Sequence, residues 1–364
     1  AAAATATAAA TAAAIATAAA TAAAIAAAAT ASIGRRSRAA RGGSALTDGT
    51  VWSAWRLVEG SQREHSDICR RALPPQLVFE RRAATLWIMR AAQEFCRCDR
   101  TAHLAAAVLE LFIRRRAPPA PPPAGWASWV EEHALAALLL ACKFQEVDIH
   151  MVDEFVTFGG ERHDGAAILR AELDVCAALR MHLAIPTRLD FLLWTLQRLR
   201  WPTMYNTHRG RHEQVGMLAH FLVDVSLLCD ACAAPPASLV ASAALCLALA
   251  VLRCGRWRGG APGPASAAEQ YWAPSMEQAT GFGASELRPV LRALQAEHEA
   301  VHAELGQEHP EEPEPLRRCH VLQHKCAHPR FHQVMQLPPF SPHGGGAVLL
   351  PRAPRTPGGH AGFD

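Results

Sequence analysis

Cysteine and histidine residues come closest to forming a chemical site in this sequence. Cys229-x-x-Cys232 has the spacing of a redox pair or half a zinc site, but no second pair follows at ligand spacing. A denser group near the C-terminus consists of Cys319, His320, His324, Cys326 and His328. Such patterns often arise by chance, and histidine is abundant throughout this chain. We therefore expect structural thiols in the first group and no metal in either.

Motifs of enzymatic catalysis are missing from the sequence. It contains no Gly-rich phosphate loop followed by Lys, no G-x-S-x-G and no H-E-x-x-H. Asp148 and Asp153 are paired carboxylates on a predicted helix, where a solvated face is the simpler interpretation. These observations predict a protein that is not an enzyme and that uses no cofactor.

Composition limits the partners and the cellular location. The 364 residues include 36 Lys and Arg against 33 Asp and Glu, so the formal charge of +3 gives no reason to expect nucleic acid. The apolar stretch Ala237–Leu252 is shorter than the roughly 20 residues of a membrane span, which favours a buried helix. Eleven cysteines in mostly apolar, helical patterns with no preceding signal peptide indicate a reducing compartment. We expect the nucleus and cytoplasm.

The two ends of the chain differ in composition from its middle. Residues 1–50 are an Ala/Thr-rich tract followed by a basic arm around Arg35 to Arg41, and they contain too few large apolar side chains for a core. The arm could be a nuclear localisation signal or a solvated segment. Residues 306–364 are first acidic and then rich in Pro, Gly and His. We expect disorder at both ends, except that Leu316–Leu337 docks on the second domain.

A first group of five helices is predicted by apolar residues at helical spacing. Its segments are Phe79–Cys96, Thr101–Arg115, Glu131–Phe144, Val147–Phe158 and Asp164–Leu179. Trp87 lies in the first segment, and Thr101 is the predicted N-cap of the second. The stretch Glu131–Glu146 is apolar on nearly every side until Lys143 and Glu146, so we expect it at the centre of a helical bundle. In the fifth segment, Ile168, Leu169, Leu173 and Val175 are predicted to face inward.

A second group of helices begins after a break at Ile185-Pro186-Thr187, where Thr187 can cap the next helix. Its segments are Arg188–Leu199, His212–Leu228, Ser238–Leu252, Ala268–Thr280 and Ser285–Glu304. No stretch has the period of a strand. The sequence therefore predicts an all-α protein with two consecutive five-helix folds, over residues 51–185, including a preceding helix, and 186–305.

Several of these segments carry ordered motifs. Thr101–Ile113 reads T-A-H-L-A-A-A-V-L-E-L-F-I, Ala137–Glu146 reads A-L-L-L-A-C-K-F-Q-E, and Ala237–Leu249 reads A-S-L-V-A-S-A-A-L-C-L-A-L. Trp272, Thr280-Gly281-Phe282, Leu287 and Pro289 keep a W…T-G-Y…L-x-P spacing. In this order they resemble the cyclin family, specifically its A/B or mitotic type, from about Phe79 to Leu337. The resemblance implies two cyclin-box folds in a divergent member.

This resemblance implies a regulatory subunit that forms a heterodimer with a cyclin-dependent protein kinase and activates it in the cell cycle at mitosis. In the family, a Lys and a Glu hydrogen-bond main-chain groups at the kinase's αC helix, and they correspond to Lys143 and Glu172. Apolar contacts are expected from Phe144, Leu139 and the fourth helix near Phe155. The family's internal Arg–Asp pair corresponds to Arg81 and Glu110, which we interpret as a structural ion pair.

A substrate-docking patch of the family is altered here. In the family it is formed by the sequence Met-Arg-Ala-Ile-Leu and a Trp. In this chain the corresponding stretch is Glu80–Ala84, which includes Arg81 and Ala84, and of the large apolar side chains only the Trp is kept, as Trp87. Small side chains lose apolar contact area, at roughly 25 cal/mol per Å². Arg90 replaces an acid that meets the motif's Arg, and Glu131 replaces a polar contact. We expect weakened docking of kinase substrates or inhibitors that carry Arg-x-Leu.

One alternative is a transcription-type cyclin, or a cyclin-fold scaffold like the core of a general transcription factor. Such a core binds DNA through a basic second repeat, but the tail after the second group is acidic first, E-H-P-E-E-P-E-P. Transcription cyclins usually lack the W…T-G-F feature found here. Both observations favour the mitotic type.

Overall fold

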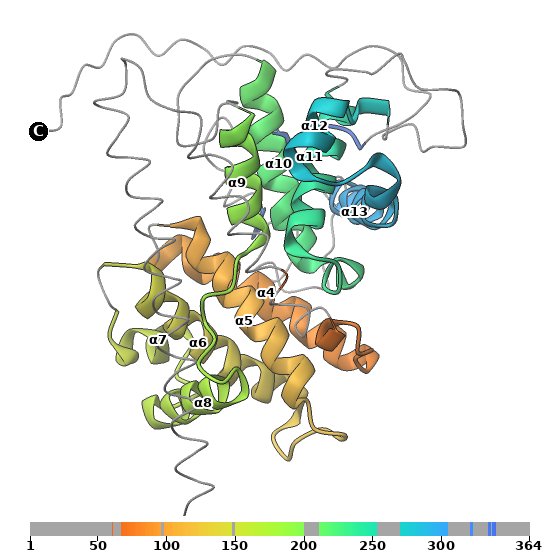
Figure 1. Cartoon of the computed structure of the whole chain (residues 1–364). Coiled ribbons are helices and arrows are strands. Elements are labelled where there is room, and N and C mark those ends of the chain that lie inside the picture. Colours follow the sequence, from red (N-terminus) through yellow and green to blue (C-terminus); the bar gives the residue numbers. More distant parts are fainter. Residues whose placement is uncertain are drawn as a thin grey trace, which may run out of the picture. The chain divides into compact units, whose positions relative to one another are not determined.

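A computed structural model of the chain describes residues 60, 67–95, 98–147, 150–199, 211–252, 270–304, 321–322, 334–335 and 337–339. In these residues all regular structure is helical (Figure 1), which confirms the predicted all-α class. By their contacts, the residues form two compact units: Ala1–Trp194 with Leu227–Val240, and Thr195–Ser226 with Ala241–Asp364. The N-terminal tract, Asp148, and the Cys319–His328 group lie outside the described residues.

The helices of the first unit follow the predicted order. They are α4 (Pro75–Phe95), α5 (Asp99–Arg116), α6 (Gly125–Gln145), α7 (Val152–Phe158) and α8 (Gly165–Ala178). The third of them begins earlier than expected, at Gly125, because Trp126 and Val130 add buried apolar residues ahead of Glu131. The fourth begins later than expected, at Val152, after an extended Met151.

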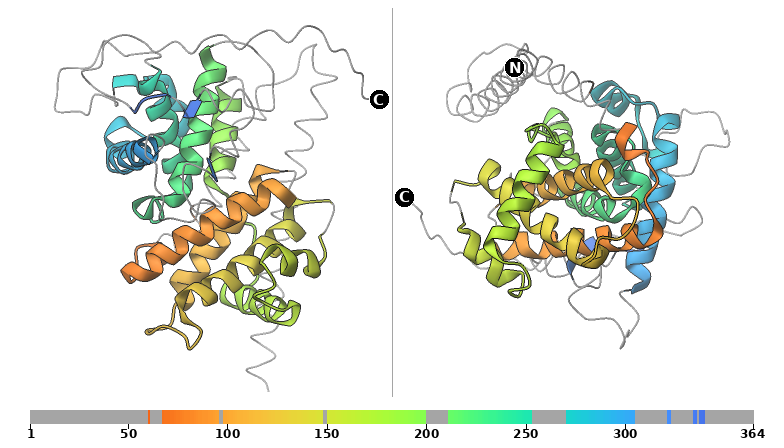
Figure 2. Two further views of the ribbon diagram at one scale, coloured as in Figure 1. Left: turned by 180° about the vertical axis from the view of Figure 1, so that it is seen from behind. Right: turned by 90° about the horizontal axis from the view of Figure 1, so that it is seen from below.

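Helix α6 is the centre of the first unit, as its apolar sequence predicts. It packs against α4, α5, α7 and α8 (Figures 1 and 2). Leu135, Leu138 and Leu139 have no exposed surface, and the burial of each stabilises the fold by about 1.5–3 kcal/mol. The burial stops at Lys143, which is exposed.

The start of α5 differs from the prediction. Cys98 occupies the N-cap position, and the helix begins at Asp99. Thr101, the predicted N-cap, lies inside the first turn, and its hydroxyl donates a hydrogen bond to the Glu146 carboxylate just after α6. Glu146 therefore holds the end of α6 to the start of α5, whereas Lys143, one turn earlier, is not used in this way.

The break at Pro186 and its cap are confirmed. Helix α9 (Arg188–Arg198) begins directly after Thr187. The hydroxyl of Thr187 accepts the N–H of Asp190 at 3.2 Å, and the Asp190 carboxylate accepts the N–H of Thr187 at 3.0 Å. This reciprocal pair satisfies two N–H groups that the first turn of a helix leaves without partners.

The second unit is built from the end of α9, α10 (Arg211–Leu228), α11 (Ala237–Val251), α12 (Pro274–Thr280) and α13 (Ala284–Glu304). The last residues of α10 and the first residues of α11 belong to the first unit. Residues Val240–Leu252 are buried, as predicted for the apolar stretch, and no described helix is long and apolar enough to cross a membrane. Buried apolar residues of the predicted docking tail are Val321, Leu322, Val334, Met335 and Leu337.

The W…T-G-F motif forms a hydrogen-bonded turn in the second unit. Gly281 ends α12 with a φ of 75°, a conformation that favours glycine. The chain then turns so that Trp272 Nε1 donates to the carbonyl oxygen of Phe282 at 2.9 Å. The buried indole N–H thereby finds a partner.

His298 makes the second unit sensitive to acid. Among the described residues neither ring nitrogen has a hydrogen-bond partner, and burial, followed by the nearby His302, lowers the pKa of His298 to about 4. The unfolded chain binds this proton near pH 6.5, so the stabilisation is complete above that pH and is lost as the pH falls toward 4.

We therefore expect His298→Phe to flatten the pH dependence of unfolding. The free energy of unfolding of the unchanged chain should fall by about 2–3 kcal/mol more than that of the variant between pH 7 and pH 4. Urea denaturation at several pH values measures this difference. Exposed His182→Phe is the control and should follow the unchanged chain. Parallel curves for the unchanged chain and the His298 variant would contradict the assignment.

Candidate functional site

An exposed ion pair joins the end of α6 to α8. Lys143 Nζ lies 2.6 Å from Glu172 Oε1, and the two side chains are 39% and 14% exposed. The structure thus brings together the two residues that the sequence singled out. Among the described residues no other hydrogen bond uses either group, which leaves further Lys143 N–H donors and a second Glu172 oxygen for a partner.

The ion pair contributes little to the stability of the fold. Exposed pairs of this kind are worth about 0.2–1 kcal/mol, because water screens them and the side chains lose freedom. The pair can therefore open or share its hydrogen bonds at small cost.

Exposed large apolar side chains lie near both members of this pair in the sequence. Phe144, next to Lys143, is 47% exposed, and Leu169 and Leu173 on α8 are 43% and 69% exposed. Leu169, Glu172 and Leu173 are three and four residues apart, so they share one face of the helix. Exposed apolar residues gathered around a polar centre are typical of a protein interface. We call Lys143, Phe144, Leu169, Glu172 and Leu173 the Lys143 surface.

The loop from α6 to α7 extends the apolar character of this region. Val147 is 96% exposed and Met151 is 68% exposed. In the described part of the chain, five of the seven exposed large apolar residues lie between Phe144 and Leu173. These five residues fall within thirty positions of the sequence, whereas Phe79 and Met181 lie outside that interval.

The structure corrects part of the predicted binding surface. Leu139 and Phe155 have no exposed surface, because four helices enclose α6 and the inner side of α7 faces them. Neither residue can contact a partner in this conformation. Leu169 and Leu173 were predicted to face inward, but Ile168, Ala171 and Val175 form the inward face of α8. The signal for the correct orientation was Glu172, whose neighbours at helical spacing are these two leucines.

Arg81 and Glu110 form the predicted structural ion pair. Arg81 Nη1 lies 3.0 Å from Glu110 Oε2, and Arg81 is 2% exposed. Arg114 binds the other oxygen of Glu110 at 2.5 Å and also binds Asp230 at 2.5 Å. Burial alone would raise the pKa of Glu110, but Arg81 and Arg114 lower it, so the carboxylate is charged. Arg81 also donates to the carbonyl oxygen of Leu227, which extends the network to the last turn of α10.

The predicted docking patch loses two of its three residues to the interior. Arg81 and Ala84 are buried, so neither is available to a ligand, and Arg81 is held by Glu110. Trp87 is half-buried against Phe158, with ring centroids 5.2 Å apart. Arg90 is exposed on the next turn and pairs with Glu94 at 3.6 Å. What remains of the docking patch is therefore the half-buried ring of Trp87, with the Arg90 guanidinium on the next turn.

Glu131 is not available for docking either. Arg162 lies 2.5 Å from one oxygen of Glu131 and His163 lies 3.6 Å from the other. These contacts hold the loop between α7 and α8 to the side of α6. The replacement of a polar contact by Glu131 thus has a structural role within the chain.

We expect Arg-x-Leu peptides to bind the Trp87 region with a dissociation constant weaker than about 100 µM. Arg90 repels a cationic side chain by about 1 kcal/mol at 4 Å in water, so the neutral Arg90→Gln should strengthen binding by up to about fivefold and the charge-reversed Arg90→Glu by up to about thirtyfold. Fluorescence anisotropy of a labelled peptide measures both. Tight binding to the unchanged chain that Trp87→Ala abolishes would contradict this expectation.

The Cys229-x-x-Cys232 thiols lie in the protein interior. Both residues are buried and neither forms a disulfide in the described part of the chain; they lie at either end of the short helix η1 (Asp230–Cys232). The carbonyl oxygen of Cys232 accepts a hydrogen bond from Arg188. Burial and this main-chain contact agree with the predicted structural thiols.

Comparisons with known proteins identify the family of the chain. Residues 51–184 match the family described as "Cyclin, N-terminal domain" and residues 186–340 match "Cyclin, C-terminal domain". The chain is 22% identical over 255 residues to the G2/mitotic-specific cyclin-A of Hydra viridissima, covering 70% of this chain and 50% of that protein. It is 23% identical over 172 residues to Cyclin-B2-1 of Oryza sativa subsp. japonica, covering 47% of this chain and 37% of that protein.

Among solved structures, a viral cyclin from Herpesvirus saimiri is similar, with a TM-score of 0.48 and 14% identity over 68% of this chain and 97% of that one. The chain spans half or less of the length of the two curated relatives named above. The two family matches together cover more than half of the chain.

Proposed function

Since this chain belongs to the cyclin family, as a divergent member of the A/B type, we propose that it binds and activates a cyclin-dependent protein kinase in cell-cycle control. Cyclins are in general non-catalytic regulatory subunits. The observation that carries the proposal is the exposed Lys143–Glu172 pair among exposed apolar side chains. We further propose that it acts in mitosis, in the nucleus and cytoplasm.

The Lys143 surface offers the two kinds of contact that hold a partner helix. Phe144, Leu169 and Leu173 supply apolar area, which favours association at roughly 25 cal/mol per Å² removed from water. Lys143 can donate to main-chain carbonyl oxygens, and Glu172 can accept from main-chain N–H groups. Such charge-assisted hydrogen bonds fix the position of the partner as well as its affinity.

Activation follows if the partner helix is the αC helix of a kinase. A protein kinase needs its αC Glu paired with the ATP-binding Lys, so the position of αC controls activity. A subunit that binds only the active position of αC shifts the equilibrium toward it, without chemistry of its own. Each 1.4 kcal/mol of differential binding changes the populations tenfold.

Activity assays with a panel of purified kinases test this proposal. The full chain is mixed with cell-cycle and transcriptional cyclin-dependent kinases, and phosphorylation of a peptide is measured. We expect at least one cell-cycle kinase to bind and to gain activity at least about tenfold. Stimulation of transcriptional kinases alone would favour the transcription-type alternative. Failure to bind or stimulate any of them would contradict the proposal.

A further inference from the structure

The connection between α7 and α8 contacts a ring on α4 and a carboxylate on α6. Phe158, the last residue of α7, lies against Trp87 with ring centroids 5.2 Å apart. Arg162 Nη2 lies 2.5 Å from Glu131 Oε1. We call residues 158–164 the cover. We propose that the cover is autoinhibitory: Phe158 and Arg162 occupy the positions that a large apolar residue and an arginine of a bound peptide take when the cover opens.

Glu131 is a carboxylate whose partners, within the described part of the chain, all belong to the cover. One oxygen is paired with Arg162, and the other lies 3.6 Å from His163 Nε2, which is too far for a hydrogen bond. That buried nitrogen has no hydrogen-bond partner among the described residues. The cover therefore binds only one oxygen of Glu131 closely. A peptide guanidinium can bind both oxygens of a carboxylate, so it can replace Arg162 with a gain in contact.

Arg162 is held weakly enough to be displaced. Its side chain is 67% exposed, and its other described contact is a donation to the carbonyl oxygen of Gly159 at 3.4 Å. Water screens an exposed pair of this kind, so an incoming arginine competes with it on similar terms. The backbone of the cover is also strained, because Glu161 has a φ of 59° next to Gly160 at 69°. A residue with a side chain disfavours this conformation, so movement of the cover relieves it.

The spacing within the cover defines the class of ligand. Phe158 and Arg162 are four residues apart, so their Cα atoms lie at most roughly 14 Å apart. Trp87 and Glu131 lie on α4 and α6, which pack against each other. An extended peptide with an arginine and a large apolar residue two to four positions apart spans a distance of this order. These residues are not part of the Lys143 surface, so the peptide site is independent of the proposed kinase binding.

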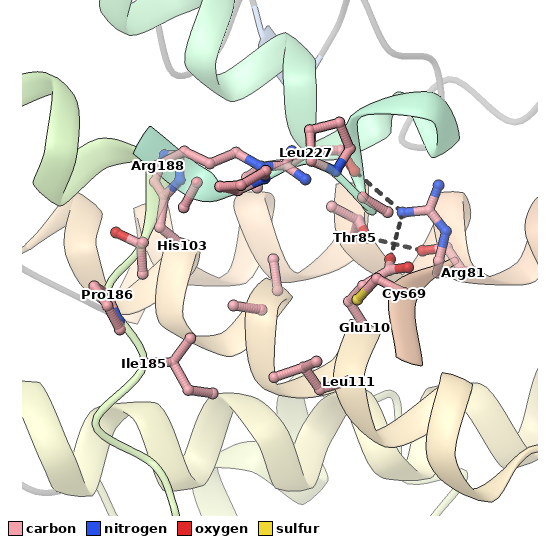
Figure 3. A pocket seen from close by; sticks show the side chains of 17 residues that line it. Cys69, Arg81, Thr85, His103, Glu110, Leu111, Ile185, Pro186, Arg188 and Leu227 are labelled. Atoms are coloured by element: carbon pink, nitrogen blue, oxygen red, sulfur yellow. Dashed lines mark hydrogen bonds and ion pairs between the residues drawn. The ribbon is translucent and has the colours of Figure 1, made fainter. Parts of the chain in front are cut away.

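Two carboxylates on α4 and α5 are already paired with arginines of the chain. Glu94 is paired with Arg90, and Glu110 is paired with Arg81 (Figure 3). Arg90 also carries the same charge as the arginine of the ligand and repels it. The arginine of a peptide is thereby directed to Glu131.

Fluorescence anisotropy of a labelled peptide that contains Arg-x-Leu tests the cover in the full chain, without a kinase. Arg162→Gln removes the competing cation and should tighten binding about twofold to fivefold. Arg170→Gln on α8 removes the same charge from an exposed residue outside the cover, and it should leave the affinity unchanged. A peptide with Ala in place of its Arg should gain nothing from Arg162→Gln.

Two further variants separate the parts of the cover. Glu131→Gln added to Arg162→Gln should abolish the gain, because the peptide arginine then has no carboxylate to bind. Phe158→Ala uncovers the ring of Trp87 and should also tighten binding. If Phe158→Ala fails to fold, the Arg162 and Glu131 variants still decide, since both residues lie at the surface.

Several outcomes would overturn the autoinhibitory role of the cover. They are an unchanged affinity of Arg162→Gln, an equal gain in Arg170→Gln, or a gain that persists in the Glu131, Arg162 double variant or with the Ala peptide. The absence of measurable binding to Arg162→Gln at about 1 mM peptide would do the same.

Discussion

Simultaneous replacement of Lys143 and Glu172 by alanine should lower the affinity for the proposed kinase partner by about a hundredfold or more. Hydrogen bonds to charged groups contribute about 1.5–3 kcal/mol each, and the double variant removes both kinds that the Lys143 surface offers. Stability should change by less than about 1 kcal/mol, because the pair is exposed. Kinase activity is measured against the concentration of the chain, and unfolding is measured in parallel.

A matched control is available on α4. Arg90 and Glu94 form another exposed ion pair, at 3.6 Å, outside the Lys143 surface. Its double replacement by alanine should leave activation unchanged. A second variant, Lys143→Arg, keeps the charge but changes the geometry of the donors, so it should activate with intermediate affinity. Normal activation by the Lys143, Glu172 double variant would show that the interface lies elsewhere, even if the chain does bind a kinase.

Leu173 provides an independent measure of the same surface. It is 69% exposed and touches the solvent with most of its side chain, so Leu173→Asp should leave the fold intact. The variant should nevertheless weaken kinase binding, because it places a charge in the apolar part of the contact. A loss of binding in this variant alone, with none in the double variant, would assign the interface to apolar contact without the ion pair.

Glu110→Gln is expected to destabilise the chain more than any surface change, by about 3–5 kcal/mol. The substitution leaves Arg81 and Arg114 buried without the carboxylate that both bind. The pKa of Glu110 is lowered in the fold, so its stabilisation is complete above the unfolded pKa near 4.5 and is lost as the pH falls below it. Urea denaturation at pH 7 measures the loss, with exposed Glu94→Gln as the control. A change below about 1 kcal/mol would mean that the network is not needed for stability.

The order and type of the helices could be predicted because they depend on local sequence. Apolar residues at helical spacing and the Pro186 break define the elements, and Thr187 with Asp190 caps α9 through neighbouring residues. The pairing of Arg81 with Glu110 was predicted from the resemblance to a family and not from spacing. The position of Lys143 at the end of a buried helix followed from the abrupt end of an apolar run.

The composition of the surface could not be predicted in the same way. Helices α6 and α8 carry apolar residues on more than one side, so periodicity alone does not say which side the neighbouring helices cover. The contacts of α8 with α6 decide that Ile168 is buried and Leu173 is exposed.

By itself, the sequence determined an all-α chain with two cyclin domains and a candidate Lys143–Glu172 pair. Only the tertiary structure decided that Leu169 and Leu173 flank the pair while Leu139 lies in the core. It also showed that Glu146 is bound by Thr101 while Lys143 is exposed. The physical reason is that burial is a property of contacts between helices far apart in sequence, whereas helix formation and capping are properties of neighbouring residues.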